Sequence, residues 1–386
     1  MATFADYQNE IYFNGLRGVL PKLPVDMATL EKMAMAAWPE TIVSYVQGGC
    51  GDERTQSLNV TAFERWGLIP RMMVDGTKRD LSITLFGMKF PTPIFMAPIG
   101  VLGICSQDGH GDLAVARAAA KTGVPMVAST LTVDPMEKVV PEFGATPGFF
   151  QLYTPTDQGV AESLVHRAEA AGFKAIVVTL DTWIAGWRPR DLNRSSFPQL
   201  RGHCLANYFS DPVFRSRLAK PIEEDPVTAV GVWASIFGKA LTWDDLPWLR
   251  SLTKLPIVLK GICHADDVRR AIDGGVDGIY CSTHGGRQAN GGVGCLEMLP
   301  AVVKAAANTP VLFDSGVRSG ADIVKAIALG ATAVGIGRPY SWGLAVDGTD
   351  GVVHVLRCLL AEAELLMAID GYPKLSDLST DALIRL

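Results

Sequence analysis

A glycine-rich segment, residues 282–292, carries a histidine and an arginine three positions apart (STHGGRQANGG). The imidazole of His284 can take up a proton near neutral pH, and the planar guanidinium of Arg287 suits a carboxylate. The surrounding glycines allow the backbone to pass close to a ligand. The segment therefore predicts a site in which a base and a carboxylate-binding arginine face one substrate.

Two further charged residues follow strand-like apolar runs. Asp181 comes directly after residues 177–180, and it could either cap the residues that follow or orient His284 and stabilise its protonated form. Lys260 ends the apolar run 257–260, where a buried ammonium needs an anionic partner. It could be a Schiff-base amine or a fixed cation beside an anionic cofactor.

Arginines recur in the neighbouring loops. Arg188 could hold a small carboxylate together with Arg287, and a surface ion pair is the alternative for Arg188. Two glycine-containing turns, residues 314–318 and 335–338, each carry an arginine and suit a phosphate. A plain tight turn is the alternative for the second. Its Gly-x-Gly lacks the third glycine of a dinucleotide-binding fingerprint.

These side chains follow apolar runs that are rich in β-branched residues and bounded by glycine or proline. Such runs are typical of parallel strands that are buried on both faces. Helical patterns that end in glycine lie between them, as at the αβ junctions of parallel α/β proteins. The predicted strands are residues 93–98, 124–129, 148–153, 174–180, 256–261, 277–282, 310–314 and 332–337. The predicted helices are residues 27–37, 39–47, 114–123, 163–172, 265–274 and 320–330.

Eight strands with intervening helices predict an α/β fold, a (β/α)8 TIM barrel, with a doubly wound sheet as the alternative. Barrel enzymes carry their reactive residues at the carboxyl ends of the strands, so we expect all the candidates at one mouth. We expect a single domain over residues 1–386. Residues 1–90 would form an N-terminal segment of helices and loops, and residues 91–386 the barrel. The long insertion 182–255, after the fourth strand, predicts a lid.

Composition excludes several classes of protein. The chain has 386 residues, a formal net charge of −5 and no lysine- or arginine-rich block, so we expect no nucleic-acid or membrane partner. Its N-terminus is polar, and no apolar run is long enough to span a bilayer. The seven cysteines are scattered without a C-x-x-C pair, which favours reduced thiols over disulfides or a zinc site. We expect a cytoplasmic protein without a metal.

Seven short segments occur in order along the chain: 45–52 (YVQGGCGD), 150–153 (FQLY), 179–181 (TLD), 259–261 (LKG), 284–288 (HGGRQ), 313–318 (FDSGVR) and 335–339 (GIGRP). Together they resemble the FMN-dependent 2-hydroxy acid oxidases and dehydrogenases, over the chain from about residue 6 to its C-terminus. Within that family the chain is most similar to the lactate 2-monooxygenase branch, on residues 65–71, 181–191 and 284–292.

The resemblance implies FMN as the cofactor and gives each candidate residue a role. A histidine base is paired with an aspartate, two arginines hold the substrate carboxylate, two tyrosines hydrogen-bond the substrate, and a lysine lies beside the flavin. The implied catalytic residues are His284, Asp181, Tyr45, Tyr153, Arg287, Arg188 and Lys260. The implied FMN contacts are Ala97, Pro98, Gly100, Ser129, Gln151, Thr179, Lys260, Ser282, Asp314, Gly316, Arg318, Gly337 and Arg338. An isomerase-type phosphate-binding barrel would lack this catalytic set.

The resemblance also implies a reaction, the oxidation of a small L-2-hydroxy acid by O2. Gly100 stands where many relatives have alanine and where the monooxygenase branch has glycine. We therefore expect the keto acid to be retained and oxidatively decarboxylated, so that lactate gives acetate, CO2 and water. An oxidase or dehydrogenase that releases the 2-keto acid, with H2O2 when O2 is the acceptor, is the alternative. Thr283 stands where the family typically has asparagine. A homo-tetramer or octamer is implied.

Overall fold

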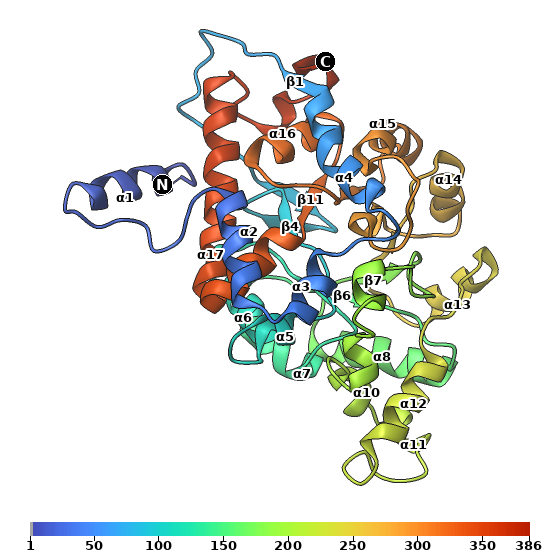
Figure 1. Cartoon of the computed structure of the whole chain (residues 1–386). Coiled ribbons are helices and arrows are strands. Elements are labelled where there is room, and N and C mark those ends of the chain that lie inside the picture. The colour runs from blue at the N-terminus through green and yellow to red at the C-terminus, as the bar shows by residue number, and fades with distance from the viewer. Residues whose placement is uncertain (1–2) are drawn as a thin grey trace.

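Eight parallel strands form a ring at the centre of the molecule in the computed structural model, which describes residues 3–386 (Figure 1). Their order is β4-β11-β10-β9-β8-β7-β6-β5. The ends of this sheet meet at a parallel bridge between Met96 and Met126, where the Met96 amide donates to the Pro125 carbonyl at 2.8 Å. The (β/α)8 barrel is therefore confirmed, and a doubly wound sheet is excluded. The strands are β4 (Ile94–Met96), β5 (Val127–Ala128), β6 (Phe149–Leu152), β7 (Ile176–Thr179), β8 (Ile257–Lys260), β9 (Gly278–Cys281), β10 (Val311–Phe313) and β11 (Ala333–Ile336).

Each barrel strand lies within one of the predicted apolar runs, because both of its faces are buried. One apolar cluster contains Phe95, Phe149 and Tyr280 with small and branched residues of the neighbouring strands. The rings of Phe95 and Tyr280 meet edge to face with centroids 5.4 Å apart. The opposite faces of the strands pack in a larger cluster with the helices.

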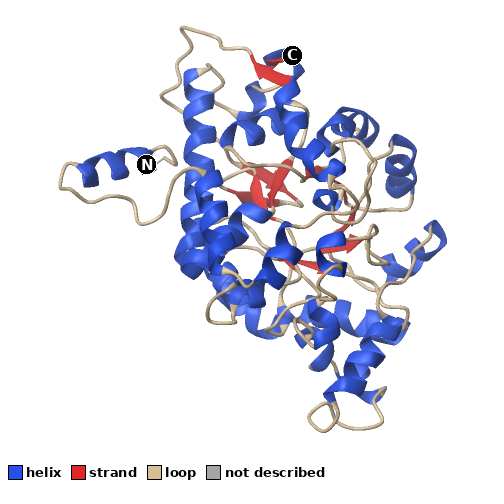
Figure 2. Cartoon of the chain, viewed as in Figure 1, coloured by secondary structure: helices blue, strands red, loops and turns tan. Residues whose placement is uncertain are grey.

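Helices alternate with the strands and surround the ring (Figure 2). α6 and α8 end at Gly123 and Gly172, whose φ angles of 71° and 110° are left-handed. Glycine adopts this conformation at low cost, which explains these two of the predicted junctions. The barrel helices are α6 (Gly111–Thr122), α7 (Met136–Val139), α8 (Gln158–Ala171), α13 (Leu246–Ser251), α14 (Ala265–Asp273), α15 (Cys295–Ala306), α16 (Gly320–Ala328) and α17 (Arg338–Ile369), and a short α5 (Leu102–Cys105) follows β4.

Residues 3–90 contain strands as well as helices, so the expectation of helices and loops alone is wrong. β1 (Trp66–Leu68) pairs antiparallel with β12 (Leu383–Arg385) near the C-terminus. β2 (Ile83–Leu85) and β3 (Met88–Phe90) form a hairpin. Phe86, in the turn of this hairpin, packs against Gly278, the first residue of β9. The hairpin therefore closes the amino end of the barrel. The helices are α1 (Asp6–Gly15), α2 (Met27–Ala37), α3 (Glu40–Gln47) and α4 (Arg54–Thr61), which confirms the two that were predicted here.

The insertion between β7 and β8 folds into short helices and turns. Ala185, Arg188, Phe197 and Phe237 of this segment line a cavity at the carboxyl ends of the barrel strands. The insertion therefore contributes to the walls of the mouth at which the site residues are expected. Its helices before α13 are α9 (Pro189–Leu192), α10 (Ala206–Phe209), α11 (Pro212–Ser216) and α12 (Pro226–Ile236).

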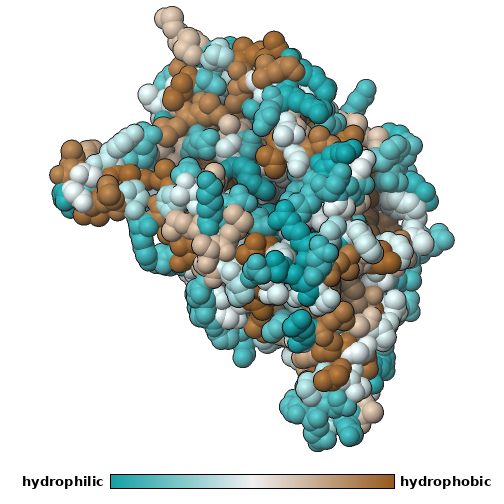
Figure 3. All heavy atoms as spheres, in the orientation of Figure 1, coloured by the Kyte–Doolittle hydropathy of each residue, from teal (hydrophilic) through white to brown (hydrophobic). Residues whose placement is uncertain are grey.

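The surface is mixed, with many polar side chains on the face that Figure 3 shows. α1 projects from the body and buries no residue, and it exposes Tyr12, Phe13 and the following Leu16. Over residues 3–386, no helix is both long and apolar enough to cross a membrane.

The burial of Phe90 in the hairpin gives a test of how the barrel is closed. Phe90 is 2% exposed and packs edge to face on Phe149. We expect Phe90→Ala to lower the free energy of unfolding by about 3–5 kcal/mol, because it leaves a cavity, in chemical denaturation of the holoprotein. Lys89→Ala, at the exposed position of the same strand, should change it by less than about 0.5 kcal/mol. Equal effects of the two changes would contradict this account.

Candidate active site

A cavity lies at the carboxyl ends of the strands, where the sequence predicts the reactive residues to meet. The predicted residues that line it are Tyr45, Ala97, Pro98, Gly100, Tyr153, Arg188, Lys260, His284, Arg287, Asp314, Gly316, Arg318, Gly337 and Arg338. The others lie behind this lining and hydrogen-bond to it or to one another; they are Ser129, Gln151, Thr179, Asp181 and Ser282. The fold thus brings all the predicted residues into one site.

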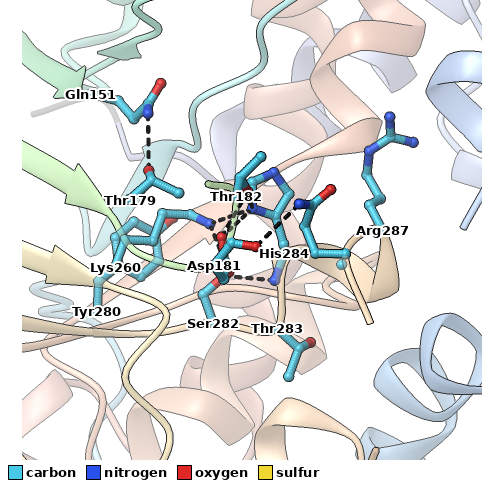
Figure 4. Close-up of polar contacts among 12 residues, drawn as sticks. Gln151, Thr179, Asp181, Thr182, Lys260, Tyr280, Ser282, Thr283, His284 and Arg287 are labelled. Atoms are coloured by element: carbon cyan, nitrogen blue, oxygen red, sulfur yellow. Dashed lines mark hydrogen bonds and ion pairs between the residues drawn. The ribbon is translucent and has the colours of Figure 1, made fainter. Parts of the chain in front are cut away.

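A histidine and a carboxylate are paired at the centre of this site (Figure 4). Nδ1 of His284 lies 2.8 Å from Oδ1 of Asp181. Because an ionised carboxylate only accepts hydrogen bonds, we assign the imidazole proton to Nδ1, which leaves Nε2 with a free lone pair. Thr182 donates its hydroxyl to the same carboxylate oxygen at 2.9 Å. His284 is thereby held in the tautomer that a general base requires.

The charges around this pair fix its protonation. Burial lowers the pKa of His284 below its ordinary value of 6.5, the Lys260 ammonium lowers it further, and Asp181 opposes both. Burial raises the pKa of Asp181, but Lys260 and His284 outweigh burial and hold this pKa well below its usual range. At neutral pH the imidazole is therefore neutral and the carboxylate ionised, as in an acid–base pair ready to accept a proton.

Lys260 is a buried cation of the site, with 2% of its surface exposed. Its Nζ lies 3.3 Å from Nδ1 of His284, 4.0 Å from Oδ2 of Asp181 and 5.5 Å from the ring centre of Tyr280. The Asp181 carboxylate is shared with His284, so it compensates the ammonium only in part. A further anionic group in the cavity would complete this compensation, which favours a fixed cation over a Schiff-base amine.

Arg287 differs in its contacts from the predicted substrate-binding role. Its Nη1 donates to the carbonyls of Gly48, at 2.6 Å, and of Tyr45 and Val46, which lie in the last turn of α3 or just after it. A cation is favourable at a helix C-terminus, where carbonyls lack partners. The guanidinium carbon also lies 4.8 Å from the centre of the Tyr45 ring. Arg287 therefore fixes the position of Tyr45 in the cavity wall.

Arg188 keeps an unpaired donor in the cavity wall. Its Nε donates to the carbonyl of Arg287 at 3.0 Å, and its Nη2 donates to the side chain of Gln288. Its Nη1 is buried and has no partner among the described residues. A buried unpaired N–H of a charged group is costly. The nearby Asp191, whose carboxylate oxygens also lack partners among the described residues, attracts this guanidinium, and an anionic ligand in the cavity would be a second partner.

A chain of buried polar side chains crosses the ends of β5, β6 and β7. Ser129 donates to Oε1 of Gln151 at 3.0 Å, and Nε2 of Gln151 donates to Thr179 at 3.0 Å. Polar side chains at this depth are expensive unless they are hydrogen-bonded. Their placement beside the cavity suits the polar edge of a planar ligand.

The loops after β10 and β11 form a cationic end of the cavity. Arg318 lies over the Trp342 ring, 5.2 Å from its centre. Burial lowers the pKa of both Arg318 and Arg338, and the charges of Arg287 and Arg318 lower that of Arg338 further. Gly337 precedes the first residue of α17, and a Cβ built there would meet nothing within 4 Å. Partly buried cations beside an open helix N-terminus fit a phosphate.

Backbone conformation and close packing explain why glycines occur in the segment 282–292. His284, Gly285 and Gly286 all have left-handed backbones, with φ angles of 54°, 62° and 74°. A Cβ at Gly286 would lie 2.5 Å from the amide nitrogen of Gln56 in α4. Only glycine fits there, and the strained φ of His284 is of the kind found at functional sites.

Thr283 takes no part in the cavity itself. Its hydroxyl donates to Oδ1 of Asn59 in α4 at 3.0 Å, and it points away from Asp181 (Figure 4). Thr283, which replaces the asparagine typical of the family, therefore lies on the side of the segment 282–292 that is hydrogen-bonded to α4.

Three residues that the sequence did not single out for the site take part in it. Thr182 bonds the Asp181 carboxylate, and Gln288 joins Arg188 to the carbonyls of Asp181 and Ile184. Both adjoin predicted residues, so adjacency was an available signal. Gln199 of the insertion is fully buried and donates to the carbonyl of Gly100 at 3.3 Å. No sequence pattern marks it.

Comparison with known proteins decides what kind of site this is. The family model described as "FMN-dependent dehydrogenase" matches residues 34–385. The chain belongs to this family. The protein is therefore an oxidoreductase with FMN as its cofactor. The family resemblance that the sequence motifs indicated is confirmed.

Similar proteins cover nearly the whole chain of this FMN-dependent dehydrogenase. An FMN-dependent alpha-hydroxy acid dehydrogenase of Penicillium citrinum is 39% identical, over 99% of this chain and 96% of its own. An L-lactate oxidase of Lysinibacillus sphaericus is 39% identical, over 94% and 93%. A structure of mandelate oxidase with benzoyl-formic acid superposes with a TM-score of 0.82 at 36% identity, over 94% and 99%.

The cationic end of the cavity generates a prediction about the cofactor. Arg318→Ala should weaken FMN binding by about 10- to 100-fold, because a charge-assisted hydrogen bond contributes about 1.5–3 kcal/mol. The measurement is the Kd of FMN for the apoprotein, from quenching of flavin fluorescence. Arg357 also lies over an aromatic ring, that of Tyr7, but outside the cavity, so Arg357→Ala should leave this Kd unchanged. An unchanged Kd in Arg318→Ala would contradict the assignment.

Proposed function

We propose that this protein oxidises a small L-2-hydroxy acid, lactate or a close analogue, with FMN as cofactor and O2 as the electron acceptor. The observation that carries the proposal is one cavity that holds a neutral imidazole, a buried ammonium and an unpaired guanidinium donor, at His284, Lys260 and Arg188. Similar proteins named L-lactate oxidase and 2-hydroxyacid oxidase support the substrate class.

The substrate carboxylate binds at Arg188. Nη1 of Arg188 is the free donor, and its guanidinium lies 5.5 Å from the ring centre of Tyr45. Arg287 supports this side of the cavity through its contacts with the end of α3. Burial raises the pKa of Tyr153 above its usual range, so its hydroxyl stays protonated and can donate a hydrogen bond to the substrate together with that of Tyr45.

Nε2 of His284 accepts a proton from the substrate. The resulting imidazolium donates from Nδ1 to Asp181, whose negative charge stabilises it. FMN, when bound, supplies the oxidant that takes the two electrons of the substrate. Lys260 then holds a positive charge beside the cofactor, since its ammonium is buried and only partly compensated.

The cofactor is held by the lining on the opposite side of the cavity. Arg318, Arg338 and the backbone at Gly337 bind its phosphate, and Asp314, Ser282 and Gly316 line the path from there to His284. The polar chain of Ser129, Gln151 and Thr179, with the turn at Ala97, Pro98 and Gly100, receives the flavin ring. These residues line the cavity or lie directly behind its wall, which supports the proposed roles.

For the product we propose that the keto acid stays in the cavity and is oxidatively decarboxylated, so that lactate and O2 give acetate, CO2 and water. Gly100 supports this proposal, since a Cβ there would lie 3.2 Å from Cβ of Leu131 and 3.4 Å from Oγ of Ser129. The insertion 182–255 acts as the lid that retains the product. Release of the keto acid with H2O2 is the alternative, and the relatives named as oxidases favour it.

We also propose that the single domain works in the cytoplasm as a homo-oligomer, a tetramer or octamer. The exposed apolar side chains of α1, Tyr12, Phe13 and Leu16, support an association between copies.

The substrate proposal is tested by mixing the purified protein anaerobically with a panel of 2-hydroxy acids and following the flavin absorbance. We expect lactate-sized L-2-hydroxy acids to bleach the band. His284→Ala should retain FMN but lower the rate constant of bleaching by about 10²- to 10⁴-fold. His110 forms a second histidine–aspartate pair, 3.0 Å from Asp134 and outside the cavity, and His110→Ala should bleach at the normal rate. Normal bleaching in His284→Ala would remove His284 from the base role.

The product proposal is tested by turnover in air, with H2O2, CO2 and the carboxylic acid measured together. We expect CO2 in a 1:1 ratio to lactate and no free H2O2. Gly100→Ala should shift turnover toward free keto acid and H2O2, because the added methyl group would press on Leu131 and Ser129 in the cavity wall and displace them. Gly231→Ala, at an open position of α12, should not. Stoichiometric H2O2 and keto acid from the unmodified protein would establish the oxidase instead.

A further inference from the structure

Three cysteines that are far apart in the sequence meet behind the active site. Cys263 follows β8, Cys281 ends β9 and Cys295 begins α15. Their Sγ atoms all lie within 4.8 Å of one another, and those of Cys281 and Cys295 are 3.7 Å apart. All three are free thiols, two of them fully buried, while Cys263 is partly exposed. None of them lines the cavity, so the proposed reaction does not use them.

The spacing of these sulfurs is close to that of a metal site. With metal–sulfur bonds of about 2.3 Å, three sulfurs around one ion in a plane lie about 4.0 Å apart. The largest separation here is no more than 4.8 Å. An ion could therefore be bound if the sulfurs moved by less than about 1 Å, through side-chain rotation alone.

The ligand set selects the kind of ion. Thiolates favour soft cations such as Cu(I) and Zn(II), but structural zinc sites have four ligands. Within residues 3–386, no histidine, aspartate, glutamate or fourth cysteine joins this group. We propose that Cys263, Cys281 and Cys295 form a three-sulfur site for a soft monovalent cation, Cu(I).

Ion binding at this site requires deprotonation. Binding by thiolates therefore releases protons, so the affinity for Cu(I) rises with pH. The partly exposed Cys263 gives the ion its path of entry.

The site touches the catalytic loop from two sides. The thiol of Cys263 donates to the carbonyl of Ser282 at 3.3 Å, and Oγ of Ser282 accepts from the amide of His284 at 3.0 Å. The amide of Cys295 donates to Oδ1 of Asn59, which also accepts from Thr283. An ion that draws the sulfurs together thus acts on both anchors of the loop that carries His284.

The test is an anaerobic titration of the reduced, FMN-loaded protein with Cu(I) buffered by a chromophoric chelator. We expect one tightly held Cu(I) per chain, with an affinity that rises with pH. Cys263→Ser should weaken binding by at least about 10-fold. Cys358→Ser should leave it unchanged, because Cys358 is also a partly buried free thiol but lies outside the group.

X-ray absorption of the Cu(I)-loaded unmodified protein gives a readout that does not depend on any variant. Three sulfur neighbours at one distance are expected. Two or fewer sulfurs, or equal Cu(I) affinity in the unmodified protein and Cys263→Ser, would overturn the proposal. Binding of Zn(II) in preference to Cu(I) would overturn the assignment of the ion.

Discussion

The site depends on one shared negative charge, the carboxylate of Asp181. Its Oδ1 accepts from His284 at 2.8 Å and from Thr182 at 2.9 Å, and its Oδ2 faces the Lys260 ammonium at 4.0 Å. This carboxylate sets the imidazole tautomer and partly offsets a buried cation. It leaves the remaining positive charge of the cavity for ligands, which suits an enzyme whose cofactor and proposed substrate are both anionic.

The barrel supplies the alignment that this arrangement needs. In the parallel register Thr179 of β7 lies beside Lys260 of β8, which in turn lies beside Tyr280 of β9. Asp181 and His284 follow these strands by a few residues, so their side chains reach Lys260 from either side. The hairpin of β2 and β3 closes the other end of the barrel, and the insertion 182–255 adds walls to the open mouth.

Much of this could be predicted from the sequence, for physical reasons. Strands buried on both faces leave continuous apolar runs, so the barrel and the residues that follow each strand could be predicted from the sequence. The hairpin was not, because its few alternating residues resemble a loop. Gln199 has no local signal, since it reaches Gly100 only through the folded insertion. The cluster of three sulfurs could not be predicted either, because residues 263, 281 and 295 come together only when the barrel folds.

The most direct test of the account is the pH dependence of anaerobic flavin reduction. His284 must be neutral to accept a proton, so the rate of flavin reduction falls as the pH drops through the pKa of His284. We predict that this acidic limb of the rate profile lies below pH 6.5. Asp181→Asn removes a charge that raises this pKa and should move the limb to lower pH. Lys260→Met removes one that lowers it and should move the limb to higher pH. A limb above pH 6.5 in the unmodified protein, or shifts of the same sign in both variants, would contradict the account.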